Sequence, residues 1–202
     1  MIRVICLLIG YVCGLFQTAY IYGKMHGIDI RTVGSGNAGT TNVMRVGGFW
    51  PGFLTFLCDA LKGFIACGIG YLVFDYINKT NAQDWSQAIY GAYICGIFCM
   101  LGHVFPVFYK FKGGKGVLCG LASLLMVDWR IGVLVVAVFA ICVALCKRVS
   151  VGSIFACASA PLWCLLLGVP GLHTVYVALA ASWLIWCHRS NIKRLLRGEE
   201  PK

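Results

Sequence analysis

Charged residues are scarce in this chain, and acidic residues are the scarcest. Only 12% of the 202 residues are charged, and Asp and Glu together number 7. Hydrophobic residues make up 60% of the sequence and the mean hydropathy is +0.84, which exceeds the apolar share of ordinary soluble domains. A soluble globular domain is therefore excluded, because the surplus of apolar side chains must face lipid.

Sequence features of several other protein classes are also missing. The 12 cysteines form neither a CxxC pair nor the Cys/His spacing of a zinc site, so we predict neither a metal nor a cofactor. We interpret them as small packing residues, although Cys95 and Cys99, like Cys142 and Cys146, share a helical face and leave a metal or redox role open. Without a long polar segment, a low-complexity tract or an internal repeat, residues 1–202 are predicted to form a single integral membrane domain.

Long apolar runs predict an all-α polytopic membrane protein with about seven transmembrane helices and short connecting loops, since a crossing helix needs about 20 mostly apolar residues. The candidate spans are residues 1–22, 49–76, 88–107, 117–127, 131–146, 151–167 and 172–187. The first is kept as a span because no A-x-A-like signal-peptide cleavage site closes it. The fourth is short, so a bundle of five or six spans with a re-entrant segment is the alternative.

The positive charge gathers on one side of this predicted bundle. The formal net charge is +10, which by itself suits nucleic acid, an acidic membrane surface or anionic substrates. Most of the cations follow the odd-numbered spans: Lys24, Arg31, Arg45, Lys110, Lys112, Lys115, Lys147, Arg148, Arg189, Lys193, Arg194, Arg197 and Lys202. The positive-inside rule places these segments in the cytosol. We therefore expect membrane lipid as a partner and no nucleic acid.

Three polar stretches on that side carry residues suited to chemistry. In the first, residues 34–45, Gly34, Gly36 and Gly39 permit backbone conformations that turn N–H groups toward an anion. Polar side chains that could complete the hydrogen bonding of a phosphate are Ser35, Asn37, Thr40, Thr41, Asn42 and Arg45. A flexible linker is the alternative, but a linker rarely needs so many small hydrogen-bonding groups. The stretch is neither a Walker A loop nor a dinucleotide fingerprint, because G-K-[ST] and the strand context are missing.

The second stretch, residues 102–116, alternates aromatic residues with lysines after Pro106. Its glycine-lysine turn, residues 113–116, suits close approach of a phosphate to the backbone, and Lys112 adds a cation. A juxtamembrane basic patch bound to anionic lipid is the alternative. His103 is interpreted either as a buried, hydrogen-bonded ring or as a member of the site.

The third stretch, residues 188–200, follows the last span. If it is helical, His188, Asn191 and Leu195 share one face; a basic tail that anchors the last helix is the alternative. Within the apolar part, Asp59 and Lys62 are expected to pair, because a lone charge inside a membrane is costly.

Five segments, in this order, resemble the signature motifs of the bacterial acyl-phosphate:glycerol-3-phosphate acyltransferases. They are SGNAGTTNVMR (35–45), DALKG (59–63), GHVFPVFYKFKGGKGV (102–117), VSVGS (149–153) and HRSNIKRLLRGEE (188–200). Small departures are Thr40, where alanine is expected, and Leu118-Cys119, where small or hydroxylated residues are expected. The resemblance implies a multi-pass enzyme of the bacterial cytoplasmic (inner) membrane with its active site facing the cytosol.

The resemblance also implies a reaction: a fatty acyl group passes from acyl-phosphate to the 1-hydroxyl of glycerol 3-phosphate, giving lysophosphatidate and phosphate in the first step of phospholipid synthesis. Neither acyl-CoA nor acyl carrier protein is used directly, and we expect a monomer. Catalytic roles are carried over to Ser35, Arg45, His188 and Asn191. Substrate-binding roles are carried over to Gly36, Asn37, Gly39, Thr41, Asn42, His103, Lys112, Gly113, Gly114, Lys115 and Ser153.

The H-x-x-x-x-D motif of other glycerol-phosphate acyltransferases is missing, since no aspartate lies five residues after any of the 4 histidines. Our hypothesis is that a phosphate oxygen of the substrate takes the hydroxyl proton, while the first stretch and Arg45 hold developing charge. Ser35 as a nucleophile is the alternative, although the sequence shows no base to activate it. The non-enzymatic alternatives are an organic phosphate transporter with Asp59 and Lys62 as an intramembrane switch, and a lipid-binding scaffold.

Overall fold

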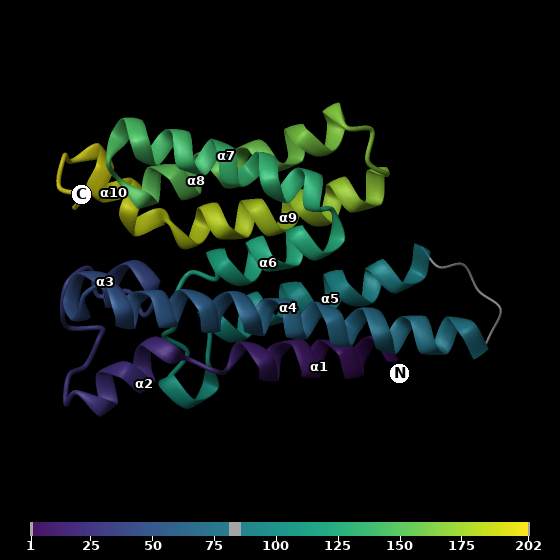
Figure 1. The fold of residues 1–202 in the computed structure, drawn as a ribbon, viewed down its shortest axis with the longest axis horizontal. Helices are drawn as coiled ribbons and strands as arrows, with labels where there is room; N and C mark the ends of the chain where they lie inside the picture. Colours follow the sequence, from purple (N-terminus) through teal and green to yellow (C-terminus); the bar gives the residue numbers. More distant parts are fainter. Residues whose placement is uncertain (1, 81–85, 202) are drawn as a thin grey trace. The chain divides into compact units, whose positions relative to one another are not determined.

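The computed structural model describes residues 2–80 and 86–201, and every regular element in that part of the chain is helical (Figure 1). Met1, where the first predicted span begins, and Lys202 lie outside the described residues. The chain divides into two compact units, Met1–Val127 and Asp128–Lys202.

The first unit is built around two long, apolar helices that pack against each other, α4 and α5. Helices α1, α3 and α6 also contact α4, and α1 and α6 contact α5. The elements of this unit are α1 (Ile2–Gly14), α2 (Thr18–Met25), α3 (Thr40–Gly47), α4 (Phe49–Thr80), α5 (Ser86–Val104), the 3-10 turn η1 (Val107–Tyr109) and α6 (Val117–Val127).

Small residues bring these helices into close contact. A Cβ atom added to Gly10 of α1 would lie 2.4 Å from the carbonyl oxygen of Cys95, and one added to Gly14 would lie 2.2 Å from that of Cys99. Both cysteines are fully buried on α5, as expected for small packing residues. Helices inside a membrane associate through such small residues because lipid offers little hydrophobic drive for helix pairing.

The first predicted span is broken rather than continuous. Helix α1 ends at Gly14 and α2 begins at Thr18, so the expectation of one helix over residues 1–22 was wrong at this point. Polar side chains satisfy the backbone at the break: Gln17, within the break itself, donates from Nε2 to the Gly14 carbonyl oxygen (3.1 Å), and Lys62 of α4 donates from Nζ to that of Phe16 (2.7 Å). A broken helix survives at membrane depth only where other protein groups complete its hydrogen bonds.

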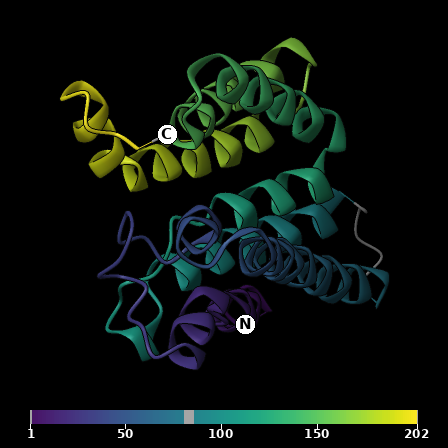
Figure 2. The ribbon, with the colours of Figure 1, turned by 60° about the vertical axis from the view of Figure 1, so that its left-hand side comes forward.

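The second unit contains α7 (Trp129–Cys146), α8 (Val149–Leu166), α9 (Gly171–Cys187) and α10 (Arg189–Leu196). Helix α8 packs against both α7 and α9 (Figure 2). The side chain of Asp128 caps the start of α7 by accepting from the N–H of Arg130 at 3.0 Å.

Five segments of the described chain are long and apolar enough to cross a membrane: Arg3–Met25, Phe49–Ile77, Ala88–Tyr109, Trp129–Cys146 and Val149–Leu166. Helices α6 and α9 are shorter apolar helices. This arrangement confirms the all-α polytopic fold with short connections. A count of seven spans and a single functional domain stay predictions.

Candidate active site

The first polar stretch folds around the buried amide of Asn42, which is fully shielded from solvent. Its Oδ1 accepts from the backbone N–H of Ser35 (2.7 Å) and from the Ser35 hydroxyl (3.1 Å). Its Nδ2 donates to the carbonyl oxygens of Ile30 (3.0 Å) and Val33 (3.1 Å). Asn42 therefore shapes the loop that presents Ser35, and its binding of substrate stays a prediction.

Glycine is required in this loop for conformation and for space. Gly34 and Gly36 both have φ in the left-handed region, +60° and +69°. A Cβ atom on Gly34 would also lie 2.3 Å from Asn42 Oδ1, so a side chain there would displace the amide that holds Ser35. Two of the three glycines singled out in this stretch thus adopt a conformation that favours glycine, whereas Gly39 is extended with φ of −152°.

The N–H groups of the loop do not form the continuous anion nest expected from the sequence. The N–H of Ser35 donates to Asn42, that of Gly36 to the carbonyl oxygen of Val33 (3.1 Å) and that of Gly39 to the carbonyl oxygen of Asn37 (3.0 Å). Helix α3 begins at Thr40 after the extended N-cap residue Gly39, and the N–H groups of Asn42 and Val43 donate to the Gly39 carbonyl oxygen (3.1 Å each), which leaves those of Thr40 and Thr41 as the ones suited to an anion. The N–H groups of a first helical turn have no partner within the helix.

Arg45 lies on α3, so the second half of the first stretch is helical rather than part of a loop or a flexible linker. Thr41 and Arg45 are four residues apart and therefore share a face of this helix. Thr41 is half-buried and Arg45 is exposed. The helix thus carries a guanidinium and a hydroxyl on one side, one turn from its N-terminus.

The second polar stretch turns back onto the end of α5. The N–H of Gly113 donates to the carbonyl oxygen of Val104 (3.0 Å) and that of Gly114 to the carbonyl oxygen of His103 (3.2 Å). A Cβ atom on Gly113 would lie 1.9 Å from the same His103 oxygen, and one on Gly114 would lie 2.2 Å from His103 Nε2. The two glycines are needed here because the turn lies directly against the imidazole and its backbone.

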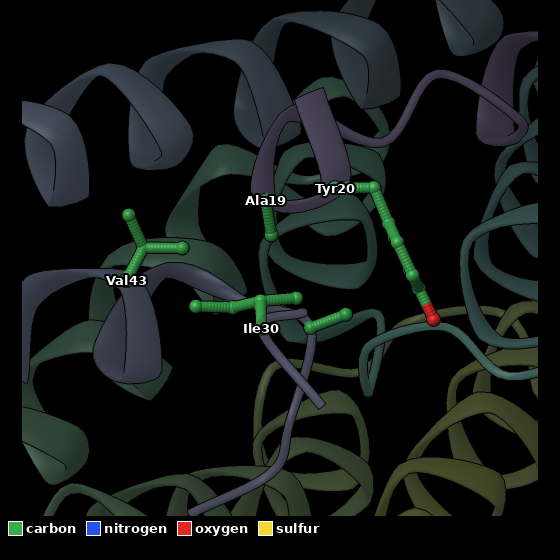
Figure 3. Packing of buried hydrophobic residues seen from close by; sticks show 5 residues of the cluster. Ala19, Tyr20, Ile30 and Val43 are labelled. Atoms are coloured by element: carbon green, nitrogen blue, oxygen red, sulfur yellow. The ribbon is translucent and has the colours of Figure 1, made fainter. Parts of the chain in front are cut away.

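The two glycine-rich stretches meet at Gly114. Its missing Cβ would also lie 2.5 Å from the carbonyl oxygen of Ala38, which belongs to the first stretch. Tyr20 of α2 supports the second stretch, because its hydroxyl donates to the carbonyl oxygen of Lys112 and its ring stacks on Tyr109 with centroids 4.0 Å apart. An apolar cluster formed by Ala19, Tyr20, Ile30, Ala38 and Val43 lies beneath them (Figure 3).

His103 belongs to a buried polar cluster at the level of the helix break. Lys62 Nζ lies 2.7 Å from Asp59 Oδ1 and 2.7 Å from His103 Nδ1, and the His103 carbonyl oxygen accepts from Gln17 Nε2 at 3.0 Å. Since the ammonium can only donate, Nδ1 is the acceptor of the ring and Nε2 carries the proton of the neutral form. The predicted Asp59–Lys62 pair is confirmed, and it also orients the ring against Gly114.

In the second unit, His188 joins α9 to α10 and is 1% exposed. Its Nδ1 lies 2.8 Å from the carbonyl oxygen of Leu184, and because a carbonyl can only accept, this contact fixes a proton on Nδ1. Asn191 follows on α10 and is also buried. The helical placement expected for the third stretch is therefore present.

Glu200 organises the end of the chain around Asn191. Its Oε1 accepts from Asn191 Nδ2 (2.6 Å), its Oε2 from Arg194 Nε (2.7 Å), and its backbone oxygen from Arg148 Nε (3.1 Å). Burial raises the pKa of the Glu200 carboxyl, but the polar groups of Ser150, Asn191 and Arg194 outweigh burial and hold the pKa below its usual value. Asn191 Oδ1 is buried and has no hydrogen-bond partner within the described chain, so the amide keeps one acceptor for another molecule.

These motifs are shared with a known protein family. A profile described as glycerol-3-phosphate acyltransferase matches residues 4–198. The chain belongs to this family. Among its relatives, a glycerol-3-phosphate acyltransferase of Clostridioides difficile is 40% identical over 98% of this chain and 94% of its own length. One of Endomicrobium trichonymphae is 37% identical over 100% of this chain and 96% of its own length.

A solved acyltransferase structure has the same fold. The crystal structure of PlsY (YgiH), an integral membrane glycerol 3-phosphate acyltransferase in its glycerol 3-phosphate form, superposes with a TM-score of 0.87 at 33% identity, covering 99% of this chain and 94% of that one. Its lysophosphatidic acid form gives a TM-score of 0.84 at 32% identity. The family resemblance expected from the five motifs and the integral membrane fold are thereby confirmed.

The acyltransferase motifs are distributed over both units. The first unit contains the predicted residues Ser35, Gly36, Asn37, Gly39, Thr41, Asn42, Arg45, His103, Lys112, Gly113, Gly114 and Lys115, and the second contains Ser153, His188 and Asn191. Ser153 is buried on α8, where its hydroxyl donates to the carbonyl oxygen of Val149 at 3.0 Å. No role was predicted for Tyr20, Gln17 or Glu200 from their residue types. Only Glu200 had a signal, since it lies within the third polar stretch, residues 188–200.

Proposed function

We propose that this glycerol-3-phosphate acyltransferase takes its acyl group from acyl-phosphate and delivers it to the 1-hydroxyl of glycerol 3-phosphate, releasing lysophosphatidate and phosphate. The observation that supports this proposal best is the meeting of the two glycine-rich stretches at Gly114 and Ala38. Two adjacent stretches that each bring cations to the same place match a reaction in which both reactants carry a phosphate.

Each stretch has a distinct share in this proposal. The first turn of α3, with Thr41 and Arg45, receives the phosphate of the acyl donor, because helix N-termini and guanidinium groups both favour anions. The turn at Gly113 and Gly114 uses its own N–H groups on the end of α5, so the cations beside it, Lys112 and Lys115, provide the contacts for a second phosphate. His188 and the unpartnered Oδ1 of Asn191 contact substrate hydroxyl or phosphate groups.

The proposed chemistry needs no acyl-enzyme. The 1-hydroxyl oxygen of glycerol 3-phosphate attacks the acyl carbonyl carbon, the bond from that carbon to the phosphate oxygen breaks, and the hydroxyl proton ends on a phosphate oxygen. Because acyl-phosphate is a mixed anhydride with a good leaving group, positioning and charge stabilisation supply the catalysis. The surroundings of Ser35 support this route, since its hydroxyl donates to the amide oxygen of Asn42, which cannot serve as a base.

The arrangement in the cell follows the charge distribution. We propose that the chain lies in the bacterial cytoplasmic membrane as a monomer, with the glycine-rich stretches facing the cytosol where glycerol 3-phosphate is dissolved. The positive-inside rule supports this orientation. The acyl chain of the donor then stays among apolar helices while its phosphate meets the polar rim.

An activity assay with defined reactants tests the proposal. Purified protein is supplied with acyl-phosphate and labelled glycerol 3-phosphate, and formation of labelled lysophosphatidate is measured. Arg45→Ala is expected to lower kcat/KM by about 100- to 1000-fold, the loss typical of a group that stabilises developing charge. Arg197→Ala, which removes an exposed cation after α10, is the matched control and should keep nearly full activity.

Two outcomes would contradict this assignment. Conversion that requires acyl-CoA and ignores acyl-phosphate would exclude the proposed donor. Mass spectrometry that finds an acyl group on Ser35 after donor alone is added would replace direct transfer by an acyl-enzyme route.

A further inference from the structure

A groove that none of the predicted site residues lines opens on the first unit. Its volume is about 700 Å³. The lining residues come from α2, from the segment after α2 and from η1, and they combine aliphatic, aromatic and charged side chains. The residues that matter for its chemistry are Ile21, Lys24, Met25, Asp29, Arg31, Phe108 and Lys110.

The groove lies where two candidate membrane spans end. Met25 is the last residue of the span that begins at Arg3, and Tyr109 is the last residue of the span that begins at Ala88. Apolar side chains of these spans are left exposed along the groove: Ile21 is 38%, Met25 77% and Phe108 78% exposed. Lys24 and Lys110 stand at the same span ends. A wall that is apolar within the spans and cationic at their ends matches an amphiphile with an anionic head.

The net positive charge of the groove favours an anionic ligand. Three cations and one carboxylate line it. The carboxylate of Asp29 is already bound by Arg31, with 2.7 Å between Oδ2 and Nη2, and the Arg31 guanidinium lies over the Tyr20 ring at 5.3 Å. Lys24 and Lys110 are both exposed and add positive charge that Asp29 does not balance. Lys110 is held at the rim in a left-handed conformation, with φ of 56°.

We propose that this groove binds the head group of an anionic glycerophospholipid from the surrounding leaflet, with Lys24 and Lys110 contacting its phosphate and the exposed apolar side chains contacting its acyl chains. The acyl donor has similar chemistry, but a donor held here would present its carbonyl carbon to none of the residues assigned to the reaction. A bound phospholipid would instead restrain the segment that leads to Ser35, because the carbonyl oxygen of Ile30 in the groove wall accepts from Asn42.

Native mass spectrometry of the purified full chain in neutral detergent tests the site directly, without any turnover. The protein is titrated with phosphatidylglycerol, and the dissociation constant of the first retained lipid is measured. The double variant Lys24→Gln/Lys110→Gln is expected to bind roughly 20- to 30-fold more weakly, at about fivefold for each lysine near an anionic head group. The matched control, Lys147→Gln/Lys193→Gln, removes two exposed cations of the second unit and should bind phosphatidylglycerol like the unmodified chain.

Two further arms separate the lipid from its rivals. Phosphatidylcholine should be retained equally weakly by both double variants. If the unmodified chain retained phosphatidylcholine as tightly as phosphatidylglycerol, the proposal would be overturned. A nonhydrolysable acyl-phosphonate should leave the bound phosphatidylglycerol in place. Displacement of the lipid by this donor analogue would identify the groove as a donor site and overturn the proposal. An equal loss of phosphatidylglycerol binding in the Lys147→Gln/Lys193→Gln control would also overturn it. None of these results depends on the proposed acyltransferase activity.

Discussion

At the scale of single residues, the glycines of this chain differ sharply in what surrounds them. An added Cβ on Gly114 would meet His103 Nε2 at 2.2 Å and the Ala38 carbonyl oxygen at 2.5 Å. Gly68, within α4, would meet nothing within 4 Å. Both are glycines of an apolar chain, but only the first holds two functional stretches together.

Gly114→Ala is therefore expected to destabilise the fold by about 1–3 kcal/mol, the usual cost of forcing an extra methyl group into a packed site, and to raise the KM for a phosphorylated substrate. Thermal unfolding in detergent and steady-state kinetics measure the two effects. Gly68→Ala is the control and should stabilise its helix by about 0.5–1 kcal/mol. Equal behaviour of the two variants would show that Gly114 does not join the stretches.

Glu200 makes a pH-dependent contribution to stability. Because its pKa is lowered in the folded chain, this contribution is fully present above the unfolded pKa of about 4.3 and is lost as the pH falls through the lower folded value. The thermal midpoint of the unmodified chain should drop across this acidic range. Glu200→Gln should lower the midpoint at neutral pH and flatten the dependence, whereas Glu199→Gln, an exposed neighbour, should reproduce the original curve. A Glu200→Gln curve as steep as the original would exclude Glu200 as the source.

At the scale of elements, α4 and α5 are tied together by charge in an otherwise apolar bundle. Asp59 and Lys62 of α4 are 4% and 5% exposed, and Lys62 reaches His103 of α5. The thiol of Cys119 on α6 also contacts this turn of α4, where its Sγ lies 3.4 Å from the Asp59 carbonyl oxygen. The contacts link the helix that carries the second stretch to the centre of the unit.

Lys62→Met should cost about 3–5 kcal/mol, because it leaves Asp59 as an uncompensated buried charge. The double variant Asp59→Asn/Lys62→Met should recover much of that loss, and acyl transfer should recover with it. Unfolding midpoints and initial rates of both variants provide the measurement. A double variant that is stable yet inactive would mean that the pair acts in the reaction or as a switch, as the transporter hypothesis requires, rather than in packing.

At the scale of the whole molecule, the proposed reaction requires the three polar stretches to open to the same side of the membrane. The single-cysteine variants Thr32→Cys and Ser190→Cys, made in a chain whose native cysteines are replaced, should both react with a membrane-impermeant thiol reagent only from the cytosolic side. Arg130→Cys, at the start of α7, should react only from the opposite side. All three positions are exposed. Labelling of Thr32 and Ser190 from opposite sides would exclude a common site and the assigned reaction with it.

Much of the architecture could be predicted from composition, because each segment that crosses lipid must be a long run of mostly apolar residues. The predicted runs at residues 117–127 and 131–146 agree with α6 and α7 to within two residues. Helix α3 escaped prediction because its short polar sequence begins in a glycine-rich stretch and has no apolar run. The break before Thr18 also escaped, because its stability comes from Gln17 and Lys62, and Lys62 is distant in the sequence.

The class of the protein, the placement of its apolar helices and the family motifs could be predicted from residue order, because hydrophobic length and residue type are local properties that one segment shows without its neighbours. The part that each polar residue plays within those motifs became visible only in the folded chain. Asn42 holds a loop, Glu200 binds the amide of Asn191, and Gly114 lets the backbone of Ala38 approach the ring of His103. Such roles depend on which groups from distant segments come within hydrogen-bonding or van der Waals distance, and only packing of the folded chain sets those distances.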